Sequence, residues 1–439
     1  MTARIAPSSV PVGTMAVLML SVFTVSMGFG IVLPVLPFVI ERLLGVGGDA
    51  TQVSHATGLL TGLYMLSLFL FAPAWGRLSD RYGQRSILLV GLIGFSATSM
   101  TFVFIESLPA IYAERFLSGL FAAAVTPVAL AAIGDHVTTE AARARRLTFV
   151  SLAGTSGFLL GPMMGVFIAR FAAALFPVMS KVGPLVLPLA VTAVLALLAA
   201  IAAMLKVPGR VVGAASPERG RRPVLQSERW LVPRLLVLAF IVSAGVGVFE
   251  VGLALRGKQE LGLTPYQIAT MFTECSLVMI IVQAIVFSPW VRPEMTRWFI
   301  VPAFAILAAG LFLVPRASNF KLVLIMIGAV AASAGILSPI LTYWISSNAG
   351  KAQGAQLGKQ TAAASLGAAV GSAAGGLLFE VAWLPNASFV LITGLTIVGL
   401  LISLPLPRML MKGHHDEPDI TPQMRLESAP VHHPRRTPT

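Results

Sequence analysis

Residues 76–85 read GRLSDRYGQR, a charged segment that lies between two apolar stretches, 55–75 and 86–105. Each apolar stretch is long enough for an α-helix to cross the hydrocarbon core of a bilayer, which takes about 20 residues. Four of the ten residues between them are charged, and Gly76 and Gly83 permit tight backbone turns that other residues avoid. The segment therefore predicts a helical membrane protein whose neighbouring spans are joined by a short polar turn.

The composition of the whole chain extends this prediction. Of its 439 residues, 56% are hydrophobic and only 11% are charged, whereas soluble domains carry about 25% charged residues. Lipid admits helices or closed β-barrels, and the apolar stretches lack the alternation of barrel strands. We therefore expect an all-α membrane protein with twelve transmembrane helices. The expected spans are 14–40, 55–75, 86–105, 108–133, 147–170, 183–206, 233–256, 266–289, 298–315, 320–345, 357–380 and 385–407.

The chain is expected to divide into two six-helix halves. Its longest polar interruption, 207–232, follows the sixth span and predicts a cytoplasmic linker between a first bundle, 1–206, and a second bundle, 233–410. Residues 411–439 are polar and rich in proline, which predicts a disordered cytoplasmic tail. Glycines recur four residues apart in the fifth and eleventh spans, which indicates duplication, although such spacing is common in membrane helices. These glycines are Gly157, Gly161, Gly165, Gly367, Gly371 and Gly375.

Lysine and arginine are distributed unequally between the two sides of the expected bundle. With the N-terminus in the cytoplasm, 23 of them fall in cytoplasmic segments and 7 in external ones. Cytoplasmic connections of membrane proteins carry such an excess, so we expect both termini and the 76–85 turn on the cytoplasmic face of the inner membrane. Because the basic residues punctuate apolar runs instead of forming one basic face, a nucleic-acid partner is not expected.

The 76–85 turn has the form G-x-L-x-D-R-x-G-x-R between the second and third spans. This pattern resembles the signature loop of the Major Facilitator Superfamily, and the resemblance covers about 14–407. It implies two six-helix bundles about a pseudo-twofold axis, a substrate site between them near the middle of the membrane, and a monomer. It also implies that the turn latches the halves in an outward-open state, whereas the structural alternative is a solvated turn. The residues of the expected latch are Gly76, Asp80, Arg81, Gly83 and Arg85.

Two further elements resemble those of the twelve-helix drug:proton antiporter group of this family. Arg115 and Gly119 match an R-x-x-x-G element implicated in proton transfer, whereas the alternative places the Arg115 guanidinium at the outer interface. Adjacent helical residues do not face each other, so Glu114 need not pair with Arg115. The fifth span matches a G-x-x-x-G-P-x-x-G element of exporters, with Pro162 as its kink, and plain helix packing is the alternative.

Three acidic residues, Glu114, Glu250 and Glu274, lie well inside expected spans. Ionisable groups at such depth are costly and mark ion or proton pathways. The first span, 14–40, has no acid, although resemblance to the antiporter group implies one there. We therefore predict that Glu250 or Glu274 carries the coupling proton with assistance from Arg115. The alternative is that Glu250 reaches outward to the interface and Glu274 caps a contact between helices.

These features together predict a proton-coupled secondary transporter, an antiporter that exports small amphipathic molecules or drugs by alternating access. A symporter that imports a metabolite and a dedicated exporter of one metabolite or siderophore are the alternatives. The GAQLGKQT segment at 354–361 lacks two residues of a phosphate-binding loop, so the proton gradient is expected to supply the energy without a cofactor. With one cysteine, Cys275, and no catalytic or metal-ligand motif, neither an enzyme nor a metal site is expected. The expected partners are the small-molecule substrate, protons and the lipid bilayer.

Overall fold

The computed structural model describes residues 11–45, 49–136, 140–175, 183–208, 230–286, 288, 291, 293–317, 320–348, 353–381, 384 and 386–415. These residues form α-helices and two short 3-10 helices and contain no strand, which confirms the expected all-α fold. In chain order the elements are α1 (Val12–Val32), α2 (Leu36–Leu44), α3 (Ala50–Tyr82), α4 (Gln84–Phe102), α5 (Leu108–His136), α6 (Glu140–Leu175), α7 (Gly183–Lys206), α8 (Leu231–Gln259), α9 (Pro265–Val286), η2 (Pro293–Phe299), α10 (Ile300–Leu313), η3 (Val314–Arg316), α11 (Phe320–Ser347), α12 (Gln353–Leu377), α13 (Ala387–Ser403) and α14 (Leu406–His415).

Eleven helical segments of the described chain are long and apolar enough to cross a membrane. They match the expected spans, with the single exception of the eleventh span, which is α12. The first turns of α12 are polar and include Lys359 and Gln360, which lowers its hydropathy. Helix α12 packs against two of the membrane-spanning helices, α8 and α3. It therefore lies among the other spans and is the twelfth of them.

The first expected span, 14–40, is not one continuous helix. It consists of α1 and α2, and the break between them contains Pro34, with Pro37 in the first turn of α2. Proline lacks the backbone N–H that an uninterrupted helix requires and its ring clashes with the preceding turn. The broken span therefore places α2 as a short separate helix at one end of the bundle.

The limits of the expected linker and tail are only partly within the described residues. The last helix of the first half ends at Lys206 and the first helix of the second half begins at Leu231. Helix α14 continues to His415, which is five residues into the segment expected to be a disordered tail. The other linker and tail residues, 209–229 and 416–439, lie outside the described residues.

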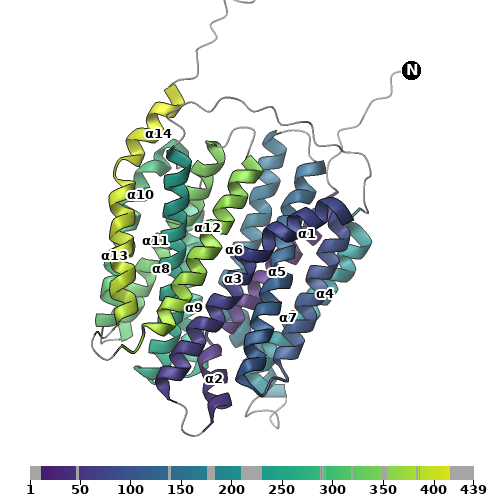
Figure 1. Ribbon diagram of the computed structural model, residues 1–439, viewed down its shortest axis with the longest axis vertical. Helices are drawn as coiled ribbons and strands as arrows, with labels where there is room; N and C mark the ends of the chain where they lie inside the picture. Colours follow the sequence, from purple (N-terminus) through teal and green to yellow (C-terminus); the bar gives the residue numbers. More distant parts are fainter. Residues whose placement is uncertain are drawn as a thin grey trace, which may run out of the picture.

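The first half, α1 to α7, and the second half, α8 to α14, repeat the same helix packing. Helix α6 packs against α1 as α12 packs against α8 (Figure 1). A Cβ atom added to Gly157 of α6 would lie 2.2 Å from the carbonyl oxygen of Phe23 in α1. A Cβ atom added to Gly367 of α12 would lie 2.3 Å from the carbonyl oxygen of Phe240 in α8. Equivalent glycines thus meet equivalent backbone positions, as an internal structural repeat requires.

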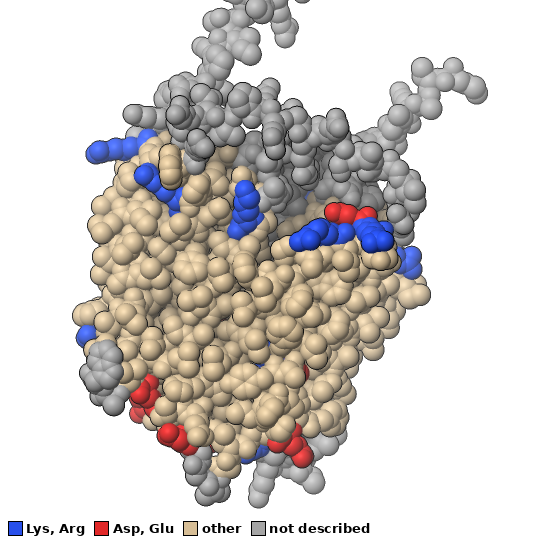
Figure 2. Space-filling model, in the orientation of Figure 1, with Lys and Arg blue, Asp and Glu red and all other residues tan. Residues whose placement is uncertain are grey.

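The bundle has two distinct ends, which we call the basic end and the α2 end. The basic end carries the turn between α3 and α4 together with α14, and most lysines and arginines on the face shown in Figure 2 gather there. The α2 end carries α2, and on the same face acidic side chains gather there. The two halves meet chiefly where α3 packs against α12 and where α6 packs against α9. Any path between the halves therefore runs between these two ends.

Candidate functional site

The charged turn at the basic end is a one-residue joint between two long helices. Gly83 separates α3 from α4 and has φ of 89° and ψ of 144°, a region that is readily populated only by glycine. Its backbone N–H donates to the carbonyl oxygen of Ser79 at 2.9 Å, and the Ser79 hydroxyl donates to the carbonyl oxygen of Gly76 at 2.7 Å. The positive φ explains why glycine occupies this position of the motif.

The charged side chains of this turn are not engaged with the other half. Asp80 and Arg81 are exposed and Arg85 is half-buried, and none of the three forms an ion pair with another described residue. The Arg81 guanidinium instead lies 5.4 Å from the ring centroid of the neighbouring Tyr82. A Cβ added to Gly76 would meet no atom within 4 Å. Among the described residues, no ion pair therefore joins this turn to the second half in this conformation.

Glu114 and Arg115 form a buried ion pair in the first half, an interaction that sequence reasoning left open. The Arg115 Nε lies 2.6 Å from Glu114 Oε2, and its Nη2 donates to Glu114 Oε1 at 2.8 Å. Glu114 is 4% exposed and Arg115 is 3% exposed, so the Arg115 guanidinium is buried within the protein beside its partner. An unpaired buried charge is strongly destabilising, so both long side chains fold toward each other although they are adjacent in sequence.

Aromatic rings surround this ion pair and connect it to neighbouring helices. The Arg115 guanidinium lies 4.9 Å from the ring centroid of Phe102 and 5.7 Å from that of Tyr64, within the range of cation–π attraction. Tyr64 stacks on Phe29 of α1 at 4.9 Å, and Phe29 stacks on Phe158 of α6 at 5.7 Å. Sequence reasoning missed the role of Tyr64, because the face of α3 on which it lies cannot be told from a uniformly apolar helix.

Glu250 and Glu274 lie in the second half without such a partner. Glu250 of α8 is 7% exposed, and it forms no hydrogen bond or ion pair with another described residue. Glu274 of α9 is half-buried, and its Oε2 is buried with no hydrogen-bond partner among the described residues. Glu274 directly precedes the buried Cys275 in α9, and α9 packs against α8, which carries Glu250. The second half thus holds two unpaired acids in one region, and no described contact links them to Arg115.

The glycine ladders that the sequence singles out lie where two pairs of helices, α6 with α1 and α12 with α8, approach each other closely. A Cβ on Gly161 would lie 2.7 Å from the carbonyl oxygen of Met27, and one on Gly371 would lie 2.2 Å from that of Ala244. Pro162 lies within α6, at the same contact with α1. The last glycine of each ladder has more room, because its added Cβ would first meet an atom at 3.5 Å for Gly165 and 3.2 Å for Gly375. The first two glycines of each ladder are therefore sterically required, Gly375 is still tightly packed against the backbone of Val248, and Gly165 alone has ordinary van der Waals space.

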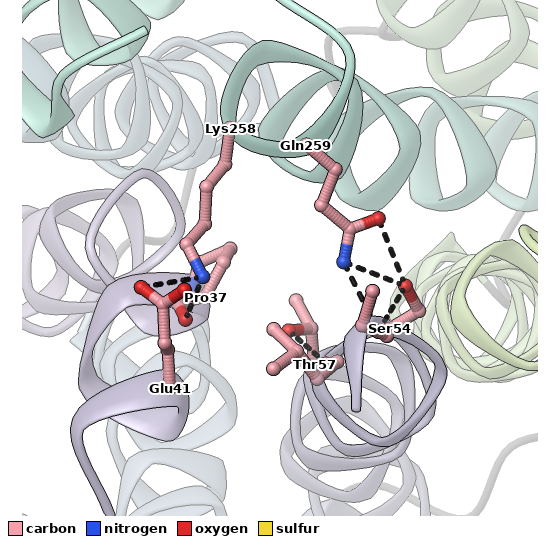
Figure 3. Close-up of polar contacts among 8 residues, drawn as sticks. Pro37, Glu41, Ser54, Thr57, Lys258 and Gln259 are labelled. Atoms are coloured by element: carbon pink, nitrogen blue, oxygen red, sulfur yellow. Dashed lines mark hydrogen bonds and ion pairs between the residues drawn. The ribbon is translucent and has the colours of Figure 1, made fainter. Parts of the chain in front are cut away.

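Polar contacts between the halves gather at the α2 end, where sequence reasoning had selected no residue (Figure 3). The Lys258 Nζ lies 2.9 Å from Glu41 Oε2. The Gln259 Nε2 donates to the carbonyl oxygen of Ala50 at 3.1 Å and to the Ser54 hydroxyl at 3.1 Å. These contacts join α8 of the second half to α2 and α3 of the first half, so they tie the halves together at this end.

A second line of contact between the halves involves α6 and α9. It is an apolar depression lined by Pro162, Gly165 and Ala169 of α6 and by Pro265 and Tyr266 of α9. These residues belong to the second half of α6 and the first turn of α9. Helices α6 and α9 thus form a second contact between the halves, in addition to that of α3 with α12.

Comparison with known proteins agrees with this arrangement. Multidrug resistance protein 1 of Bacillus subtilis (strain 168) is 27% identical over 382 residues, which cover 84% of this chain and 90% of that protein. Quinolone resistance protein NorA of Staphylococcus aureus (strain COL) is 24% identical over 367 residues, which cover 83% of this chain and 89% of that protein. The crystal structure of a D-xylose-proton symporter has a TM-score of 0.70 at 14% identity, and the likeness covers 91% of this chain and 98% of that one.

The family profile that matches is that of the Major Facilitator Superfamily, over residues 18–358 and 258–435. The two repeated helix bundles, the contacts of α3 with α12 and α6 with α9, and the charged turn of α3 and α4 agree with that match. The chain is a multi-pass membrane protein and belongs to the Major Facilitator Superfamily of secondary transporters.

Proposed function

We propose that this transporter is a proton-coupled antiporter that exports small amphipathic or drug-like molecules across the cytoplasmic membrane. The observation that carries the proposal is the difference between its buried acids. Arg115 neutralises Glu114 in the first half, whereas Glu250 and Glu274 in the second half have no cation partner among the described residues. The relatives named for multidrug and quinolone resistance support export of drug-like molecules.

The proposed coupling follows from the free energy of an unpaired carboxylate. A charged carboxylate inside the bilayer is costly unless a cation or water stabilises it, and Glu250 is buried without a cation partner among the described residues. A proton neutralises it directly. Loss of that proton therefore favours a conformation that admits water or substrate. Proton binding and conformational change are thereby linked without a metal or an organic cofactor.

The orientation in the membrane is also part of the proposal. The distribution of lysine and arginine supports a cytoplasmic basic end and an external α2 end. The polar contacts between the halves at the α2 end, and an α3–α4 turn without an ion pair to the second half among the described residues, then support an inward-facing state. We propose that the carrier acts as a monomer, with the substrate bound between the halves near the middle of the membrane.

In this cycle the α3–α4 turn is proposed to act as a latch that engages the second half only in the outward-facing state. We expect Asp80→Asn and Arg85→Ala each to reduce efflux sharply at near-normal expression, because each removes one charge of the latch. Gly83→Val should be more damaging, since its φ of 89° is strained for a β-branched residue. Efflux rate per amount of protein is the measurement.

Arg77→Ala is the matched control for the latch, because Arg77 is an exposed arginine of the same turn outside the motif. It should transport like the parent. Parental efflux by both the Asp80 and the Arg85 variants would contradict the latch.

A proton symporter that imports a metabolite is the second candidate, since the same fold occurs in a D-xylose-proton symporter. A dedicated exporter of one metabolite or siderophore is a narrower form of the first proposal. The test is expression in an efflux-deficient host exposed to a panel of amphipathic compounds. Export predicts decreased susceptibility and decreased cell content for several of them. Increased cell content of a metabolite instead would favour the symporter, and decreased content of a single compound would favour the dedicated exporter.

A further inference from the structure

Glu41 and Lys258 occupy equivalent positions in the two halves. Met27 of α1 and Ala244 of α8 are equivalent, because each presents its carbonyl oxygen to the matching glycine of the neighbouring helix. Glu41 lies fourteen residues after Met27, and Lys258 lies fourteen residues after Ala244. The two residues that form the ion pair are therefore related by the internal repeat.

A residue touches its own counterpart only where it lies on the twofold axis that relates the two units. The contact of 2.9 Å between Lys258 Nζ and Glu41 Oε2 thus places this pair on the pseudo-twofold axis, at the α2 end. Two identical halves would bring like charges together at this point. The two halves instead carry opposite charges at this position, Glu41 in the first and Lys258 in the second, so the contact is attractive.

The surroundings of Lys258 come almost entirely from α2. Lys258 Nζ contacts the carboxylate of Glu41, donates to the carbonyl oxygen of Pro37 at 3.2 Å, and lies 5.4 Å from the ring centroid of Phe38. The Lys258 side chain is 9% exposed, whereas that of Glu41 is 59% exposed. The Lys258 side chain is thus largely covered by protein, and its ammonium group has all of its described partners in α2, as Figure 3 shows for Glu41 and Pro37.

Flanking contacts require the same closed arrangement. The Thr51 hydroxyl donates to Glu380 Oε2 at 2.9 Å, which joins the start of α3 to the segment after α12. A Cβ added to Gly58 of α3 would lie 2.6 Å from the Cα of Gly376 in α12. Backbones this close leave no room for a passing molecule between α3 and α12.

We infer that Glu41 and Lys258 form a clasp on the pseudo-twofold axis that holds the α2 end shut and breaks once in every transport cycle. The inference rests on the alternating-access cycle proposed above. Gln259, Ser54, Thr51 and Glu380 extend the clasp to either side. Glu41 and Lys258 act as positioning residues, since they set the equilibrium between closed and open α2 ends and need not touch the substrate.

The test measures how often the α2 end opens. Thr57 is 1% exposed and lies one helical turn beyond Ser54 in α3, so a thiol there reacts only when this end opens. Thr57→Cys is introduced into a Cys275→Ser chain, which leaves one thiol. The purified protein in lipid nanodiscs is then labelled with a hydrophilic maleimide.

Glu41→Lys should raise the labelling rate about tenfold, because like charges then face each other across the axis. Lys258→Glu should act in the same direction. The double exchange, Glu41→Lys with Lys258→Glu, restores opposite charges and should return the rate to within about twofold of the parent. Glu106→Lys makes the same charge change at an exposed residue before α5, and it should leave the rate unchanged.

Parental labelling of Glu41→Lys, or labelling of the double exchange as fast as that of Glu41→Lys, would overturn the clasp. If Glu41→Lys fails to fold, Glu41→Gln takes its place and should label faster than the parent, with parental labelling again overturning the inference. The labelling requires neither substrate nor a proton gradient. If the labelling rates are as expected but the protein exports no compound, the proposed function is wrong and the clasp is still supported.

Discussion

Glu250→Gln is expected to abolish substrate accumulation driven by a proton gradient while leaving substrate binding in place. Glutamine has the size of the protonated acid and cannot release a proton, so the carrier loses the step that links the gradient to the conformational change. Glu250 is the more buried of the two unpaired acids, and a charge at that depth has the largest effect on the equilibrium. Glu274→Gln should reduce coupling in the same way if the two acids share the proton.

The measurement compares gradient-driven uptake with equilibrium binding of the same compound in matched proteoliposomes. Glu106→Gln is the control, because Glu106 is an exposed acid between α4 and α5, and it should keep parental uptake. If Glu250→Gln and Glu274→Gln both accumulate substrate against its gradient at the parental rate, neither acid carries the coupling proton. Glu114 and Asp80 would then be the residues to test.

Gly371→Leu and Gly161→Leu are expected to block transport and to lower the yield of folded protein. The nearest backbone oxygens lie 2.2 Å and 2.7 Å from the position of an added Cβ, so even one methyl group forces the paired helices apart. Overpacking of this kind costs about 1–3 kcal/mol, and the larger leucine side chain should exceed that range. Thermal stability in detergent and efflux rate are the two measurements.

Gly165→Ala is the matched control in the same ladder. Its added methyl group would first meet Ile31 at 3.5 Å, an ordinary van der Waals contact. It should therefore retain parental stability and efflux. Parental behaviour of both leucine variants would show that the close approach of these helices is not needed.

The membrane spans could be predicted from the sequence because hydropathy is a local property of each segment. The first span was expected to be one helix, but Pro34 separates α1 from α2. The eleventh span was expected as an apolar stretch, 357–380, but α12 is less apolar than the other spans because its first turns are polar and it is rich in small residues. The position of α12 across the membrane depends on tertiary packing, because its small residues pack against α8 and α3.

The side-chain partners of the site could be predicted only in part. Buried acids are rare enough in a membrane helix that Glu114, Glu250 and Glu274 stood out at once. Whether each acid has an ion-pair partner depends on side-chain conformation, which the sequence does not give. Glu114 and Arg115 form an ion pair although adjacent residues of a helix point in different directions. Glu41 and Lys258 are distant in the chain and meet only because the halves close, so neither could be identified without the fold.

The central claim, that protons and substrate move in opposite directions, is tested most directly in inverted membrane vesicles with an acidified lumen. Addition of a compound that the chain exports should alkalinise the lumen as the compound enters it, and a protonophore should stop the accumulation. Vesicles with Glu250→Gln should show neither response. Accumulation that persists after the protonophore, or a compound that leaves the lumen together with protons, would contradict proton-coupled export.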